Sequence, residues 1–125
     1  MATLTIKYGG EDFFVKYLEI LSPLLKLTRK ERLILSEIMK EDYLRRDLNL
    51  KDRYRIILSY EGRVDICNSL DINPQSFRNA LGVFRREGYL TRDKNNIESL
   101  APYLRVDPDK FSQITFNFVK ETKDG

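Results

Sequence analysis

Residues 59 to 92 constrain the fold of this chain most, because two helix patterns there are separated by only a short turn. Ser59 is a plausible N-cap for the first helix, and Asn73 is a plausible N-cap for the second. Pro74 would stand at the first position of the second helix, where its missing amide hydrogen removes no helical bond. Gly88 suits the position just past the end of that helix. The segment therefore predicts a helix, a tight turn and a second helix.

The two predicted helices span residues 60–70 and 74–87. The second helix has apolar residues at the i, i+3, i+4, i+7 spacing of a single buried face, namely Phe77, Ala80, Leu81 and Phe84. That face should pack inward, which leaves a polar and basic face toward solvent. The residues on this outer face are Gln75, Ser76, Arg78, Asn79, Gly82, Arg85 and Arg86.

Short strand patterns accompany the helices. Residues 89–92 and 97–100 read as two strands around a polar turn, which is the pattern of a hairpin. Residues 3–8 and 113–119 alternate apolar and polar side chains, as half-buried strands do. An unpaired strand at 113–119 would present an aggregation-prone edge, so we expect it to pair with residues 3–8 or with the hairpin. The predicted fold class is α+β, mainly helical with a small β component.

A capping box marks another helix start, because Thr28 and Glu31 can each bond the backbone amide of the other. The apolar stripe that follows predicts a helix through Met39. The charged residues 41–50 indicate that this helix ends and that a loop follows. A further helix is predicted at residues 51–58.

The chain has 125 residues, enough for one domain with its own core. With 42% hydrophobic and 33% charged residues, it has the composition of a soluble globular protein. We expect a single domain with an N-terminal strand and a helix at 11–21 in its first part. Its four parts are residues 1–27, a helix-turn-helix core and hairpin at 28–100, a C-terminal extension with a strand at 101–119, and a polar tail at 120–125.

The location expected from the sequence is the cytoplasm, without a membrane span. No apolar run approaches the roughly 20 residues that a transmembrane helix needs, and the N-terminus lacks the pattern of a secretory signal. Cys67 is the only cysteine, so no internal disulfide can form. Its place on an apolar helix face predicts a buried side chain in a reducing compartment.

The sequence lacks the residues that most catalytic and metal sites need. It has no histidine, the commonest general base and transition-metal ligand. One cysteine without histidine leaves no structural zinc site, and no phosphate-binding loop motif occurs. The acidic pairs Glu41-Asp42 and Asp107-Pro108-Asp109 have no companion nucleophile. We therefore predict that the protein is not an enzyme and has no catalytic residue, cofactor or metal.

Positive charge is concentrated around the second helix of the opening segment. Residues 74–94 hold five basic and two acidic residues, a net charge of +3, which equals the net charge of the whole chain. Such a concentration suits contacts with phosphates. An ordinary solvated helix face accounts for it equally well.

The order of these motifs resembles the winged helix-turn-helix of bacterial regulators of the multiple-antibiotic-resistance type. Residues 27–35 fit that family's helix opening, Leu-Thr-x-x-Glu-x-x-hydrophobic-Leu. Residues 72–76 and 85–92 fit the start and the end of its recognition unit. The resemblance covers roughly half to two thirds of the chain, and the layout is also similar to that of short winged-helix proteins of bacteriophages. The long dimerising helices of the family have no counterpart here, because residues 113–119 read as a strand.

The resemblance implies sequence-specific binding of double-stranded DNA and a role in transcriptional regulation. A recognition helix at 74–87 would enter the major groove, and a wing at 89–100 would touch the backbone or the minor groove. Gln75, Arg78 and Asn79 are the predicted base contacts, since these side chains can pair bidentately with adenine or guanine. Ser76, Arg85 and Arg86 are the predicted phosphate contacts. The hairpin tip would touch the backbone or the minor groove through Arg92, Lys94 and Asn95.

A protein-binding module is the alternative, because winged helices also dock proteins in larger assemblies such as a polymerase complex or a virion. That hypothesis predicts an exposed apolar patch, with Tyr103, Phe111 or the last strand as candidates. A homodimer is also possible, through the helix at 11–21 or the strands at 3–8 and 114–119.

Overall fold

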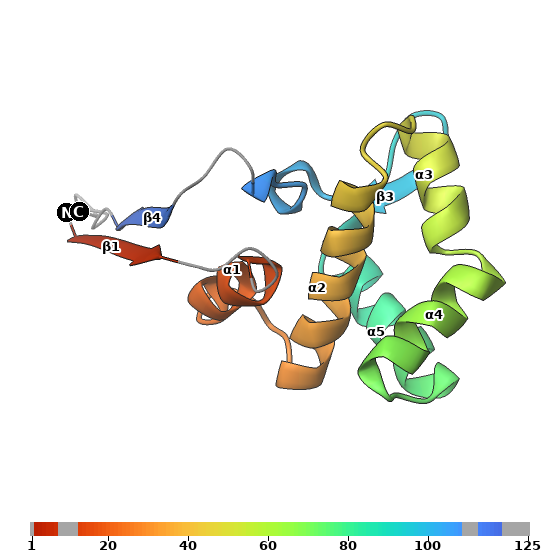
Figure 1. The fold of residues 1–125 in the computed structure, drawn as a ribbon, viewed down its shortest axis with the longest axis horizontal. Helices are drawn as coiled ribbons and strands as arrows, with labels where there is room; N and C mark the ends of the chain where they lie inside the picture. The colour runs from red at the N-terminus through yellow and green to blue at the C-terminus, as the bar shows by residue number, and fades with distance from the viewer. Residues whose placement is uncertain (1, 8–12, 109–112, 119–125) are drawn as a thin grey trace, which may run out of the picture.

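The computed structural model describes residues 2–7, 13–108 and 113–118 (Figure 1). This part of the chain is mainly helical with two short antiparallel ribbons, which confirms the α+β prediction. None of its helices has the length and apolarity that crossing a membrane requires. In chain order, the elements are β1 (Ala2–Lys7), α1 (Phe13–Leu21), α2 (Arg29–Leu44), α3 (Leu50–Ile57), α4 (Tyr60–Leu70), α5 (Pro74–Arg86), β2 (Leu90–Arg92), β3 (Glu98–Leu100), the 3₁₀ turn η2 (Pro102–Leu104) and β4 (Gln113–Phe118).

Each ribbon pairs two antiparallel strands. β1 pairs with β4, with Ala2 opposite Phe118, so the first and last predicted strands do pair with each other. β2 pairs with β3, with Leu90 opposite Leu100, which confirms the hairpin after α5. Parts of the predicted elements lie outside the described residues, namely Tyr8, the start of the helix predicted at 11–21, Phe111, Val119 and the tail at 120–125.

The capping box starts α2 as the sequence predicts. The Thr28 hydroxyl accepts a hydrogen bond from the Glu31 amide at 3.2 Å, and the Glu31 carboxylate accepts one from the Thr28 amide at 2.8 Å. The sequence predicted a helix end followed by a loop within residues 41–50, and α2 ends there, at Leu44. The polar residues after Met39 stay helical since one of them, Asp42, is buried against α3.

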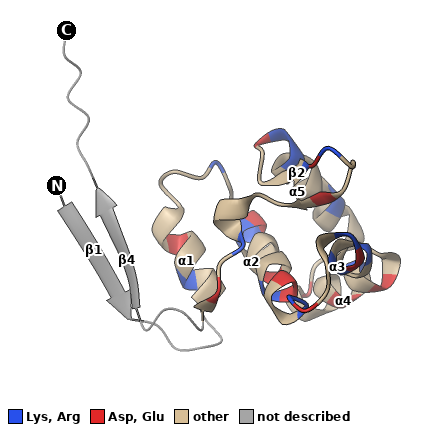
Figure 2. Cartoon of the chain, turned by 90° about the horizontal axis from the view of Figure 1, so that it is seen from above, with Lys and Arg blue, Asp and Glu red and all other residues tan. Residues whose placement is uncertain are grey.

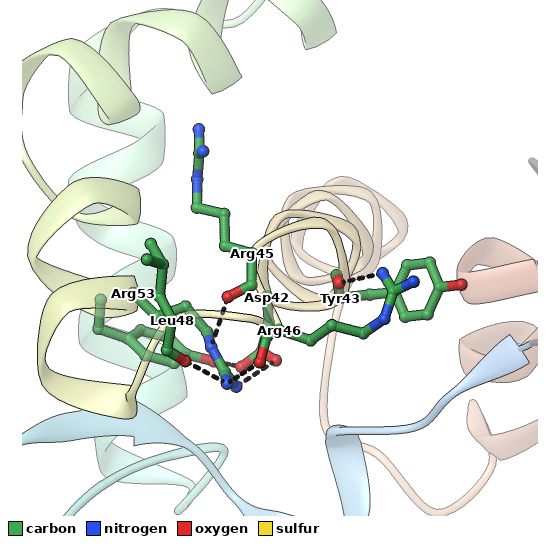
Figure 3. Close-up of polar contacts among 7 residues, drawn as sticks. Asp42, Tyr43, Arg45, Arg46, Leu48 and Arg53 are labelled. Carbon is green, nitrogen blue, oxygen red and sulfur yellow. Dashed lines mark hydrogen bonds and ion pairs between the residues drawn. The ribbon is translucent and has the colours of Figure 1, made fainter.

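Asp42 belongs to a polar cluster that closes the loop between α2 and α3 (Figure 3). Its carboxylate accepts hydrogen bonds from the Arg53 guanidinium at 3.0 Å and from the Tyr54 hydroxyl. Arg53 also donates to the carbonyls of Arg45, Arg46 and Leu48, at 2.7 to 3.1 Å. Burial, followed by the charge of Asp42, raises the pKa of Tyr54. The cluster is structural: it satisfies the loop carbonyls that would otherwise need water.

One hydrophobic core joins all five helices and the β2–β3 ribbon. The predicted inner face of α5 is confirmed, since each of its four apolar residues is at most 2% exposed. Cys67 is buried and unpaired, as predicted. Phe13, Phe14 and Leu18 of α1 are buried within the same chain, so this face of α1 is occupied without a second copy.

The corner between α3 and α4 depends on Gly62. A Cβ added there would lie 2.3 Å from the Ile57 carbonyl oxygen and 2.4 Å from that of Ile56, so a larger residue would push the two helices apart. Ser59 caps α4 at the same corner: its hydroxyl accepts from the Gly62 amide at 3.0 Å and donates to the Ile56 carbonyl at 2.7 Å.

Candidate nucleic-acid interface

The turn between α4 and α5 sets the position of α5. Asp71, the C-cap of α4, has left-handed backbone geometry with φ of 53°. Asn73 caps α5 by accepting a hydrogen bond from the Ser76 amide at 2.7 Å, and Pro74 occupies the first turn. Gly88, with φ of 81°, ends the segment as predicted. The hydrogen bonds of both caps join residues at most four positions apart in the chain. The conformation of the turn therefore depends on nearby residues.

The outer face of α5 presents one stripe of exposed residues, at positions i, i+3, i+4, i+7 and i+11. The three predicted base-contacting side chains lie together in its first half. Gln75 Nε2 donates to Asn79 Oδ1 at 2.8 Å, and Arg78 Nη2 donates to Gln75 Oε1 at 2.7 Å. The stripe is therefore partly organised before any partner binds. Its members are Gln75, Arg78, Asn79, Gly82 and Arg86.

Gly82 leaves a gap in the middle of this stripe. A Cβ added at Gly82 would meet no heavy atom of the described residues within 4 Å. Close packing of another described helix therefore does not explain the glycine. Glycine within a helix costs about 1 kcal/mol relative to alanine, and no packing contact among the described residues accounts for that cost at Gly82.

Ser76 lies where α5 meets the start of α2. It is only partly exposed, and Lys30 Nζ lies 3.5 Å from its hydroxyl. Lys30 and its neighbour Arg29 are exposed and basic. The sequence did not indicate either as a site residue, because they are far from α5 in the chain. The structure thus places a basic side chain of α2, Lys30, beside the start of α5.

Arg85 forms an ion pair with Glu98, an acidic residue outside the segment 74–94. Its Nε and Nη2 donate to the two carboxylate oxygens of Glu98 at 2.8 and 2.9 Å. Arg92 Nη2 lies 3.9 Å from the same carboxylate. The hydrogen bond from Arg85 lowers the pKa of Glu98 and raises the pKa of Arg85. Glu98 therefore neutralises part of the positive charge of Arg85 and Arg92, two of the predicted backbone contacts. The net charge counted over residues 74–94 did not include Glu98.

The hairpin tip is organised by Asp93, whose carboxylate accepts hydrogen bonds from the amides of Asn95 and Ile97 at 2.8 and 3.0 Å. Arg92 Nη1 donates to the Asn96 carbonyl at 3.2 Å. Lys94 is exposed and forms no ion pair with any residue that the structure describes. The tip thus presents Lys94 and Asn95 outward on a well-defined turn.

The charge around α5 is mixed in sign. Arg86 lies 3.6 Å from the carboxylate of the adjacent Glu87 but stays largely exposed. Figure 2 shows basic and acidic positions interleaved along the ribbon of the described helices. Local hydrogen-bonding groups on α5 therefore distinguish this surface better than net charge does.

Comparison with known proteins identifies no relative. No protein-family model, curated protein or solved structure matches this chain.

Proposed function

We propose that α4, α5 and the β2–β3 ribbon form a winged helix-turn-helix that binds double-stranded DNA sequence-specifically. In this arrangement α5 enters the major groove, and the ribbon lies against the backbone or the minor groove. The observation that carries the proposal is the exposed stripe on α5, in which Gln75, Arg78 and Asn79 are linked by hydrogen bonds. Transcriptional regulation is the role that such binding would serve.

The chemistry of the stripe favours the edges of bases. Arginine can pair bidentately with guanine, and asparagine or glutamine can pair bidentately with adenine. The bare backbone at Gly82 would let the duplex lie close to the helix. Arg86 within the stripe, Lys30 beside Ser76 and Lys94 at the hairpin tip offer the basic groups that phosphates require.

The double substitution Arg78→Ala with Asn79→Ala tests the proposed base contacts. We expect the wild type to enrich a preferred duplex from a randomised pool, and the double variant to bind that duplex no better than a scrambled one. Each good bidentate pair contributes about 1–3 kcal/mol of discrimination. Both side chains are exposed, so the free energy of unfolding should stay within about 0.5 kcal/mol of the wild-type value.

The measurement is fluorescence anisotropy of the preferred and scrambled duplexes at two salt concentrations. Lys16→Ala, at an exposed basic position on α1, is the control and should preserve discrimination. Wild-type affinity should fall steeply from about 50 to 200 mM salt, because neutralised phosphates release counterions. Unchanged discrimination by the double variant would refute the assignment of α5. Absence of salt-dependent binding to any duplex would refute DNA binding altogether.

A further inference from the structure

A second feature of this region is a pocket of about 230 Å³ between α4 and the start of α5. One side is formed by a single face of α4, and the other by the turn and first residues of α5. Tyr60 stands at its edge and is 83% exposed, which is unusual for a large aromatic side chain. The apolar residues that line the pocket are Val64, Cys67, Ile72, Pro74 and Phe77.

The charged residues that line this pocket are both basic. Arg63 and Arg78 line it, and no acidic residue is among the described residues that do. Arg63 donates through Nε to the Leu58 carbonyl at 2.8 Å, and Arg78 donates through Nη2 to Gln75. Because a guanidinium has five N–H donors, these bonds leave further donors on both arginines. Arg85 has the largest effect in lowering the pKa of Glu98, and the charge of Arg63 adds a smaller one, but Glu98 does not line the pocket.

We propose that this pocket binds an apolar side chain from an acidic segment of another protein. The apolar side chain would fill the space between α4 and α5, and neighbouring carboxylates would pair with Arg63 and Arg78. Protein interfaces concentrate their affinity in such places, where an apolar anchor enters a pocket beside arginines.

Duplex DNA matches this pocket less well than a peptide does. A duplex presents phosphates and base edges, while the apolar faces of its bases are stacked inside. The carboxylates of an acidic peptide satisfy the arginines as phosphates would, and its apolar side chain also fills the pocket. The inference concerns α4 as well as α5 and does not require that the protein bind DNA.

The test uses the full ¹⁵N-labelled chain and a capped hexapeptide, Glu-Glu-Phe-Leu-Glu-Glu. We expect saturable shifts of the backbone amides of Val64, Cys67 and Phe77 at up to millimolar peptide. The matched peptide Lys-Lys-Phe-Leu-Lys-Lys should produce none, because its charge has the wrong sign. A third peptide, Glu-Glu-Gly-Gly-Glu-Glu, should also produce none, because it lacks the apolar anchor.

Two substitutions separate the charged rim from the apolar pocket. Arg63→Gln should weaken peptide binding about two- to fivefold, the size expected for an exposed ion pair. Val64→Phe should fill the pocket and weaken binding at least about tenfold, since the apolar anchor loses its burial. Arg63 is partly exposed, so Arg63→Gln decides the question even if the Val64 variant does not fold.

Three outcomes would overturn the proposal. The first is no saturable shift at the pocket with the acidic apolar peptide. The second is an equal response to the control peptides. The third is a pocket that responds only to duplex DNA, with Arg63→Gln weakening DNA binding alone, because the pocket would then be part of a DNA-binding surface.

Discussion

At Gly82, the stability of α5 favours alanine, whereas the proposed DNA binding favours glycine. The position is exposed and surrounded by open space, so alanine would fit and would favour the helix. The proposed DNA binding would account for glycine here, because the duplex would occupy the space of a side chain. The residue therefore offers a test in which stability and binding should change in opposite directions.

We expect Gly82→Ala to raise the free energy of unfolding by about 0.5–1 kcal/mol, because alanine loses less backbone entropy in a helix. The same variant should bind the preferred duplex more weakly, because the added methyl group would stand between α5 and the groove. Urea unfolding and fluorescence anisotropy measure the two effects. A more stable variant with unchanged DNA affinity would contradict a close approach at Gly82.

Among the structural elements, the β2–β3 ribbon is tied to α5 by charge as well as by the core. Glu98 of β3 accepts two hydrogen bonds from Arg85 at the end of α5. That contact lowers the pKa of Glu98 below its usual value of 4.5. The pair therefore stabilises the fold above about pH 4.5 and stops doing so as the pH falls through the lowered pKa.

We expect Glu98→Gln to reduce the free energy of unfolding at pH 7 by about 0.5–1 kcal/mol, the upper part of the range for partly exposed pairs. The difference from wild type should vanish in acid, where the wild-type carboxyl is also neutral. Glu98→Gln should also strengthen DNA binding, because it frees Arg85 and Arg92 for phosphates. Urea unfolding across pH and anisotropy of a scrambled duplex provide the measurements.

Glu19→Gln is the matched control, since it makes the same change in net charge at an exposed position on α1. It should alter neither stability nor affinity by a comparable amount. A stability loss in Glu98→Gln that persists unchanged in acid would show that the ion pair is not its cause. Equal gains in DNA affinity for both variants would point to net charge rather than to the ribbon.

In the whole molecule, the two proposed surfaces share Arg78. It lies in the outer stripe of α5 and also lines the pocket between α4 and α5. If both proposals hold, one guanidinium cannot pair with a base edge and a peptide carboxylate at once. The α4–α5 unit would then exchange a DNA partner for an acidic protein partner.

Competition between the two ligands is therefore expected. Glu-Glu-Phe-Leu-Glu-Glu should displace a fluorescent duplex at constant salt, measured as a fall in anisotropy. Glu-Glu-Gly-Gly-Glu-Glu has the same charge and should displace far less, which separates pocket binding from general electrostatic effects. Simultaneous binding of the apolar acidic peptide and the duplex would refute the shared use of Arg78.

Features defined by near neighbours in the chain were predictable. The caps at Thr28, Ser59 and Asn73 each bond an amide three residues ahead, so a short sequence pattern contains both partners. The buried face of α5 follows from helical periodicity alone, and Gly88 ends the segment with the positive φ that glycine favours.

Features that join distant residues were not predictable in the same way. The sequence did not indicate that Asp42 is buried, because its partners Arg53 and Tyr54 lie on another helix, α3. Gly62 reads as an ordinary residue of α4, and only the carbonyls of α3 show why a side chain is excluded.

The sequence by itself determined the helices around the turn, the inward face of α5 and the chemistry of its outward face. Only the tertiary structure decided that Glu98 restrains Arg85, that Lys30 joins the surface at Ser76, and that α4 and α5 enclose a basic apolar pocket. The physical reason is the separation along the chain of the residues that interact. Helix caps and periodicity act within a few residues, whereas ion pairs and pockets depend on how separate elements pack.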